Sequence, residues 1–217
     1  MVRAETVKFK KKTQLILIAS VILWLCAVGT GLCLLWDYEN SPGITATAPP
    51  HWPTNSQIQR APERATLIMF AHPHCPCSRA SIGELAKLMT RCQGRVSAIV
   101  LFFRPEGFPS DWEKTNLWSS AERIPGVTVM SDEGGIQARS FNAATSGQIV
   151  VYDVAGQLVF SGGITIARGH AGDNTGVDAI TSLLITGEAD QKETLVFGCP
   201  IFNIDSVCAE GDKVCDK

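Results

Sequence analysis

The sequence predicts an α/β domain, built as a mixed sheet with helices on both faces and preceded by one N-terminal transmembrane helix. Three observations predict this arrangement. Residues 15–35 are apolar and uncharged, strand-like runs alternate with helix-periodic segments from residue 66 onward, and the alternation ends in a hairpin and a helix. Alternation that ends in this way is typical of a mixed sheet covered by helices.

The transmembrane helix is predicted over residues 15–36. Its uncharged core, Leu15–Leu35, is 21 residues long, which at 1.5 Å per residue spans the hydrocarbon core of about 30 Å. Lysines precede this stretch and acidic residues follow it (Lys8, Lys10, Lys11 and Lys12 before; Asp37 and Glu39 after). The positive-inside rule therefore places residues 1–14 in the cytoplasm and the remainder across the membrane. For a bacterial source this is a single-pass inner-membrane protein with a periplasmic domain.

A cleaved signal peptide is the alternative to a retained signal anchor. Ala46-Thr-Ala48 resembles a cleavage site. The apolar stretch is longer than the roughly 7–15 residues of a signal peptide, and it ends about ten residues before that site. The retained anchor is therefore favoured.

Three regions are expected after the helix. Residues 37–63 are rich in Pro, Ser, Thr and Ala and predict an extended tether that holds the domain away from the membrane. Residues 64–186 carry the alternating pattern of the domain. Residues 187–217 form a C-terminal tail with three cysteines, of which Cys208 and Cys215 enclose a polar loop and are expected to form a local disulfide.

The strands are predicted from apolar runs and the helices from apolar residues at helical spacing. A β-branched and aliphatic run marks the first strand, a near-continuous apolar run marks a central strand, and Val154-Ala-Gly156 joins the two strands of the hairpin. Expected strands are Thr66–Ala71, Arg95–Phe103, Val127–Met130, Gln148–Asp153 and Gln157–Ser161. Expected helices are Pro76–Cys92, a segment capped by Ser110 or Asp111 that ends at Glu122, Gly135–Phe141, and Thr175–Leu184 capped by Asp173.

Composition excludes one class of function. It does not decide the redox compartment, which has to be inferred from the membrane anchor. The net charge is −2 with no basic face beyond the N-terminus, so nucleic-acid binding is not expected. Of eight cysteines, Cys26 and Cys33 lie in the apolar stretch, where a thiol is a small hydrophobe. Cys92 ends a predicted helix and is expected to be buried.

The stretch with the most chemistry is His72-Pro-His-Cys-Pro-Cys77, which joins the first strand to the first helix. Two thiols and two imidazoles have no packing rationale there. Cys75 is expected at the helix N-terminus, where backbone amides favour a thiolate. His72 and His74, when protonated, and Arg79 would add positive charge.

The strand, the cysteine pair at a helix start and the late hairpin ending in Gly162-Gly163 resemble the thioredoxin-fold superfamily. Together with Thr145-Ser-Gly147 and Gly198-Cys-Pro200, the cysteine stretch is most similar to the membrane-anchored RedB-like proteins. The resemblance covers about residues 64–186 and implies a thioredoxin-like fold and thiol chemistry. Two features depart from it. One residue, Pro76, separates the thiols instead of two, and Ser146 stands where the family has a cis-proline that binds extended substrate and shields the thiols from metal.

The leading interpretation is a thiol–disulfide oxidoreductase that needs no cofactor. Cys75 would be the exposed nucleophile and Cys77 the resolving cysteine, acting on protein thiols or disulfides of exported or electron-transport proteins. A disulfide across so short a spacing is strained and therefore oxidising. His72, His74, Arg79, Ser146, His170 and Cys199 are expected beside the pair.

The alternative interpretation is a copper- or zinc-binding assembly factor without turnover. Thiolates select soft ions such as Cu(I), and imidazole suits copper or zinc. The ligands would be Cys75, Cys77, His74 and Cys199, if the tail returns Cys199 to the site; His170 is a further candidate.

Overall fold

The computed structural model describes residues 2–44 and 46–202, with side chains from Thr13 onward. Cys208, Cys215 and the disulfide expected between them lie outside the described residues. The chain divides into two units, Met1–Glu39 and Asn40–Lys217. Each unit is described by itself below.

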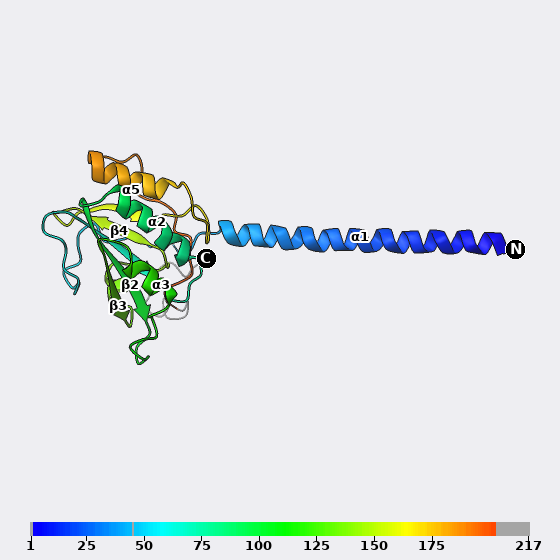
Figure 1. Ribbon diagram of the computed structural model, residues 1–217, viewed down its shortest axis with the longest axis horizontal. Helices are drawn as coiled ribbons and strands as arrows, with labels where there is room; N and C mark the ends of the chain where they lie inside the picture. Colours follow the sequence, from blue (N-terminus) through cyan, green and yellow to red (C-terminus); the bar gives the residue numbers. More distant parts are fainter. Residues whose placement is uncertain (1, 45, 203–217) are drawn as a thin grey trace. The chain divides into compact units, whose positions relative to one another are not determined.

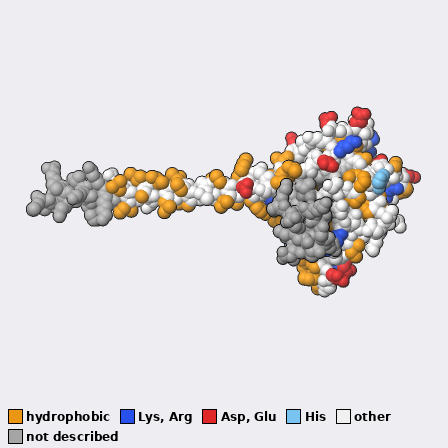
Figure 2. All heavy atoms as spheres, turned by 180° about the vertical axis from the view of Figure 1, so that it is seen from behind, with side chains coloured by type: hydrophobic (Ala, Val, Ile, Leu, Met, Phe, Trp, Pro, Cys, Tyr) orange, Lys and Arg blue, Asp and Glu red, His pale blue; other side chains and the backbone are white. Residues whose placement is uncertain are grey.

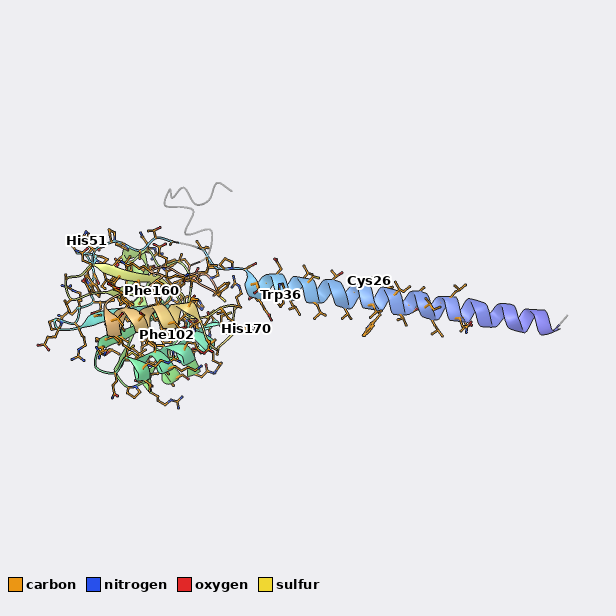
Figure 3. All side chains as sticks on the ribbon, turned by 90° about the horizontal axis from the view of Figure 1, so that it is seen from above. Cys26, Trp36, His51, Phe102, Phe160 and His170 are labelled. Atoms are coloured by element: carbon orange, nitrogen blue, oxygen red, sulfur yellow. The ribbon has the colours of Figure 1, made fainter. Side chains whose placement is uncertain are left out.

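The first unit consists of helix α1, Val2–Asn40. Its segment Thr13–Asn40 is 28 residues long with a mean hydropathy of 2.4, which is long and apolar enough to cross a membrane. Hydrophobic side chains cover the described part of the helix, and Cys26 and Trp36 project from it (Figures 2 and 3). The predicted N-terminal apolar helix is confirmed.

The second unit is built on a five-stranded sheet of order β3-β2-β1-β4-β5 (Figure 1). Strands β1, β2 and β3 are parallel, whereas β4 runs antiparallel to β1 and β5 antiparallel to β4. The strands are β1 Ala65–Ala71, β2 Val96–Arg104, β3 Val127–Glu133, β4 Ile149–Tyr152 and β5 Leu158–Gly162. The helices are α2 Ser78–Arg91, α3 Asn116–Glu122, α4 Ile136–Ser140 and α5 Thr175–Thr186. This is the mixed sheet with flanking helices that the sequence predicts.

Alternate residues of the strands face two separate hydrophobic cores. On one face, Leu67, Met69 and Val100 pack against helices α2, α3 and α5. On the other face, Phe70 and Tyr152 pack against helix α4, the segment before β1 and the end of the described chain. Helices therefore cover both faces as predicted, but the second face has only one short helix.

The segment before β1 is part of the domain, contrary to the expected free tether. Ala48 and Ile58 are buried in the second core. The Trp52 ring packs edge-on against Phe141 and Tyr152, with centroids 5.1 and 5.3 Å away. The Tyr152 hydroxyl donates a hydrogen bond to the Pro49 carbonyl. The sparse apolar residues of this segment show no periodicity because the segment packs in an extended conformation, residue by residue.

Helix starts differ from the predicted ones because other side chains cap them. Helix α3 begins at Asn116, where the Thr115 hydroxyl accepts from the Leu117 amide, and not after Ser110 or Asp111. Helix α5 is capped by Asn174, whose side chain accepts from the Val177 amide, and not by Asp173. Strand β3 extends to Glu133, three residues beyond the predicted end at Met130.

Replacing Trp52 with alanine is expected to destabilise the domain by about 2–4 kcal/mol. Loss of the indole ring creates a cavity in the second core, and few other elements are there to fill it. The measurement is chemical unfolding of the full chain in detergent, followed by circular dichroism. His51→Ala is the matched control, since His51 is the exposed neighbour (Figure 3). Equal unfolding midpoints for the two variants would contradict the assignment of this segment to the core.

Candidate functional site

The cysteine pair lies in the turn between strand β1 and helix α2. Consecutive turn bonds run from the Ser78, Arg79 and Ala80 amides to the carbonyls three residues earlier. They delay the start of α2 to Ser78, so Cys77 is the residue at the helix N-cap. Cys75 therefore lies before the helix, and the prediction that it occupies the helix N-terminus is wrong.

A third thiol joins the pair from the far end of the chain. The sulfur atoms of Cys75, Cys77 and Cys199 all lie within 4.8 Å of one another. We call these residues the thiol cluster. All three are free thiols in this structure. The sequence left open whether Cys199 reaches Cys75, and the structure brings the two together.

The tail segment, residues 192–202, places Cys199 through backbone pairing. Near its start, the Ser161 amide donates to the Lys192 carbonyl over 2.9 Å. Further on, the Ser146 amide donates to the Cys199 carbonyl over 2.8 Å, and the Ile201 amide to the Ala144 carbonyl over 2.8 Å. Phe197 and Ile201 are buried. The tail therefore docks on the domain.

Cys75 is a buried sulfur surrounded by hydrogen-bond donors. Its side chain is 1% exposed, so it is not the exposed nucleophile expected from the sequence. The thiol and amide of Cys199 and the hydroxyl and amide of Ser78 donate to it. These bonds, led by the one from the Cys199 thiol, lower the pKa of Cys75 to about 4, although burial opposes the shift.

The other two sulfurs of the cluster remain protonated. Burial, followed by the nearby Cys75 thiolate, raises the pKa of Cys77. The hydrogen bond that the Cys199 thiol donates to Cys75 raises the pKa of Cys199, because deprotonation would break this bond. The cluster thus holds one thiolate and two thiol donors.

Two serines form a hydrogen-bond chain that ends at Cys75. The His72 amide donates to the Ser146 hydroxyl over 2.7 Å, which leaves that hydroxyl free to donate. The hydroxyls of Ser146 and Ser78 lie 2.7 Å apart. Ser78 in turn donates to the Cys75 sulfur. The hydroxyl protons of Ser146 and Ser78 can therefore both point along this hydrogen-bond chain toward Cys75. Ser78 was not expected at the site, because a serine after a cysteine carries no distinctive signal.

Ser146 has a further role at the position where the resembled family has proline. Its backbone amide pairs with Cys199, a bond that proline cannot make. Both Ser78 and Ser146 are fully buried, at 0% exposure. There are no cis peptide bonds among the described residues.

The two histidines lie in an aromatic group beside the cluster. His72 stacks on Phe103 at 5.9 Å, and His74 meets Trp112 edge-on at 4.6 Å. The His74 amide donates to Nδ1 of His72. Burial lowers the pKa of His72, which favours the neutral ring at neutral pH and works against the positive charge expected from it.

The cation beside the thiols is Arg168 and not Arg79. The positive charge of Arg168 lowers the pKa of both Cys77 and Cys199, against the larger effects that raise it. Its guanidinium donates to the Ser41 and Gly198 carbonyls. Arg79 is exposed on α2. The polar loop after β5 was a signal for Arg168, but spacing could not rank it above Arg79.

His170 lies outside the thiol cluster. Its side chain is exposed at the surface of the same loop (Figure 3). The cluster identified among the described residues contains neither His74 nor His170. Cys92 is fully buried at the end of α2, and burial raises its pKa, which confirms that it is a core residue.

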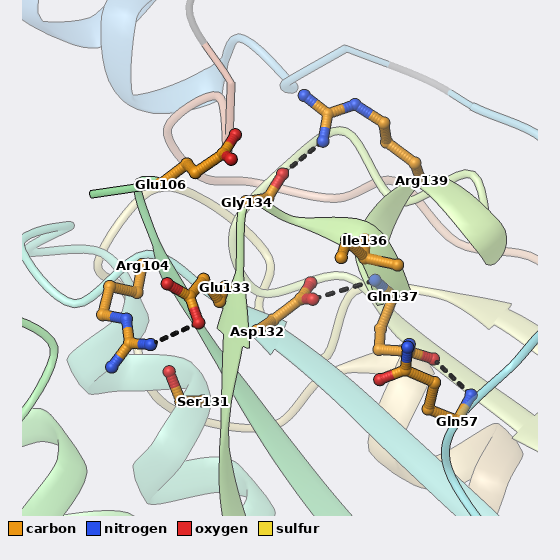
Figure 4. Close-up of a pocket in the computed structure, with 10 residues that line it drawn as sticks. All are labelled: Gln57, Arg104, Glu106, Ser131, Asp132, Glu133, Gly134, Ile136, Gln137 and Arg139. Atoms are coloured by element: carbon orange, nitrogen blue, oxygen red, sulfur yellow. Dashed lines mark hydrogen bonds and ion pairs between the residues drawn. The ribbon is translucent and has the colours of Figure 1, made fainter. Parts of the chain in front are cut away.

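A charged pocket lies beside strands β2 and β3 and helix α4, and its lining contains no cysteine (Figure 4). Arg104 pairs with Glu133 at 2.6 Å across it and with the buried Glu113 at 3.6 Å. Asp132 accepts hydrogen bonds from the Gln137 and Ala138 amides at the start of α4. Arg104 and Asp132 thus have partners of their own, and the pocket is separate from the thiol cluster.

Comparisons with known proteins establish the fold alone. No protein-family model matches the chain, and no curated protein is significantly similar to it. The crystal structure of an uncharacterized conserved protein from Geobacillus kaustophilus is similar with a TM-score of 0.54 and 21% identity, covering 75% of this chain and 92% of that one. A hypothetical protein from Sinorhizobium meliloti is similar with a TM-score of 0.52 and 19% identity, covering 75% and 97%. A secreted disulfide oxidoreductase from Mycobacterium tuberculosis has a TM-score of 0.41 and 14% identity, covering 57% and 81%.

Proposed function

We propose that this chain is a membrane-anchored thiol–disulfide oxidoreductase acting on protein thiols or disulfides of exported or electron-transport proteins. The convergence of the Cys75, Cys77 and Cys199 sulfurs within 4.8 Å carries the proposal. Disulfide exchange proceeds by attack of a thiolate on a sulfur, so it needs an activated thiolate with other sulfurs in reach. Cys75 supplies the thiolate, and the other two cysteines supply the sulfurs.

The environment of Cys75 favours an oxidising protein. Hydrogen bonds from Cys199 and Ser78 stabilise its thiolate, which belongs to the reduced form. A stabilised reduced form makes a protein a stronger oxidant. A disulfide between Cys75 and Cys77, separated by one residue, would be strained and would add to this tendency. The cysteine sulfurs themselves carry the electrons, so no cofactor is required.

The proposed location is the periplasmic face of a bacterial inner membrane. The support is the apolar helix segment Thr13–Asn40 together with the lysines that precede it in the sequence. Under the positive-inside rule the thioredoxin-like domain then faces an oxidising compartment. There, disulfides can form and persist without reduction by cytosolic thiols.

A second candidate function is binding of a soft metal ion, and the same three sulfurs favour it. With metal–sulfur bonds of about 2.3 Å, three thiolates around one ion lie about 4 Å apart. The observed limit of 4.8 Å allows this with a small contraction. Copper(I) fits three thiolates better than zinc, which prefers four ligands. His74, expected as a further ligand, is exposed outside the cluster.

A mass measurement distinguishes the two candidates. The full chain carrying Cys208→Ser and Cys215→Ser, purified in detergent and equilibrated in a glutathione redox buffer, is expected to lose the mass of two hydrogen atoms on oxidation, since these two changes remove the local disulfide expected in the tail. Cys75→Ser abolishes this change, because the thiolate that all exchange passes through is gone. Cys92→Ser is the control, since Cys92 is buried away from the cluster in the helical core and its loss leaves the change intact. Stoichiometric copper without any redox-dependent mass change would instead establish the metal-binding function.

A further inference from the structure

The tail segment lies beside the thiols as an extended peptide would. It pairs antiparallel with the loop before β4. The pairing consists of an isolated bridge between Thr145 and Pro200 and of the hydrogen bonds that the Ser146 and Ile201 amides donate, as described above. Gly198 approaches so closely that a Cβ there would overlap the Ser146 carbonyl oxygen. The tail thus occupies the backbone positions that an incoming extended peptide would need in order to pair with this loop.

Docking of the tail leaves the three sulfurs unequally accessible. Cys75 is 1% exposed and Cys77 is 6% exposed. Cys199 is the partly exposed member of the thiol cluster. Because exchange requires an attacking sulfur to reach the attacked one, Cys199 is the most accessible member of the thiol cluster to a partner protein.

We propose that Cys199 is the sulfur through which this chain exchanges with its partners, and that the disulfide it stores joins Cys199 to Cys75. This inference rests on the proposed oxidoreductase function and deepens it. The Cys199 thiol already donates to the Cys75 sulfur, so the two atoms face each other. A bond between them closes a long loop, whereas a bond between Cys75 and Cys77 closes a small strained ring. Cys77 is therefore not the resolving cysteine.

The exchange balances in two steps. A partner thiolate attacks the Cys199 sulfur of the stored disulfide, which forms a partner–Cys199 mixed disulfide and releases Cys75 as a thiolate. A second thiolate of the partner then attacks the partner sulfur of that mixed disulfide, which forms the partner's own disulfide and releases Cys199, which takes up a proton. The chain gains two electrons and one proton, the partner loses two electrons and two protons, and the remaining proton passes to solvent.

The serine chain fits the role of Cys75 as the leaving sulfur. The Ser78 hydroxyl and amide donate to Cys75 in the reduced chain, and neither bond depends on a proton from Cys199. The Ser146 hydroxyl supports Ser78 from behind at 2.7 Å, and both are buried. Donors fixed in place before the bond breaks stabilise the departing thiolate without rearrangement. At Cys77, the Cys199 thiol is the hydrogen-bond donor that lowers the pKa, and burial outweighs it.

The test compares serine variants of the full chain in detergent, in a background with Cys208→Ser and Cys215→Ser. After equilibration with glutathione disulfide, the loss of two hydrogens is expected to persist in Cys77→Ser and to vanish in Cys199→Ser. Tryptic digestion of the oxidised background chain should release the fragment with Cys75 and Cys77 cross-linked to the fragment with Cys199. Serine keeps the size of the side chain and a hydrogen-bond donor at each position. The digest is an independent measurement, because it requires no substitution in the thiol cluster.

The outcomes separate the two proposals. Loss of the mass change in Cys77→Ser, or an uncross-linked fragment that lacks two hydrogens, overturns the assignment to Cys199 while the oxidoreductase function stands. Absence of any mass change in the background chain overturns the oxidoreductase function itself. In Cys75→Ser, glutathione should remain attached to Cys199, because the Cys75 thiolate that would displace it is absent and burial keeps Cys77 protonated. Attachment to Cys77 instead would overturn the inference.

Discussion

Gly198→Ala is expected to open the thiol cluster and to increase the rate at which iodoacetamide alkylates Cys75. The added methyl group would overlap the Ser146 carbonyl oxygen, which is backbone and cannot turn aside. The tail must then move away from the loop, and the hydrogen bond from the Ser146 amide to the Cys199 carbonyl breaks. Overpacking of this kind costs about 1–3 kcal/mol, so alkylation through the opened state should accelerate by about one to two orders of magnitude.

The measurement is the alkylation rate of the reduced full chain, with the labelled cysteine located by fragment mass spectrometry. Gly83→Ala provides the matched control. Gly83 lies in helix α2 with nothing within 4 Å of its added Cβ, so alkylation should stay at the unmodified rate. If Gly198→Ala and Gly83→Ala react at the same rate, the tail does not limit access to Cys75.

A second large effect is expected in the titration of the Cys75 thiol. Followed by the ultraviolet absorbance of the thiolate, the reduced chain should titrate this group at a pKa of about 4. In Cys199→Ala the largest cause of the lowering is removed, and the pKa should rise. In Cys199→Ser a hydroxyl still donates to the sulfur, and the pKa should remain low. Equal pKa values in the alanine and serine variants would show that Cys199 is not the main donor.

The same shift makes the stability of the reduced chain depend on pH. The folded-state pKa of Cys75, about 4, lies below the ordinary thiol value of 9.0. The stabilisation from the thiolate is therefore complete above pH 9.0 and is lost as the pH falls toward 4. The unfolding free energy of the reduced chain should accordingly decrease over this range relative to that of Cys75→Ser, which lacks the thiol.

The sequence was most informative where burial is uniform along an element. Strands β1 and β2 are covered on both faces, so their near-continuous apolar runs identified them to within a residue. Helix starts were less predictable, because several adjacent polar residues can cap a helix and only the fold decides between them. Asp173 and Asn174 are such neighbours, and the structure uses Asn174.

The candidate site was predictable in its local part and not in its distant part. A cysteine pair between a strand and a helix is visible as a motif, whereas Cys199 reaches the pair by backbone pairing from a distant segment. Arg168 reaches it from the loop after β5, where its side chain bonds to the Ser41 and Gly198 carbonyls. Arg79 was the nearest cation along the chain, but the helix that carries it turns its side chain to solvent. Spacing thus located the thiols and could not reveal what covers them.

The segments before β1 and after α5 are joined to each other beside the thiols. The Gly43 amide donates to the Val196 carbonyl over 2.8 Å. Arg168 holds the Ser41 and Gly198 carbonyls with one guanidinium. A proteolytic cut between residues 44 and 62 would therefore not simply release an intact domain from its membrane helix. It would separate Ser41 and Gly43 from the domain and loosen the cover of Cys75, so that shedding and loss of thiol protection become one event.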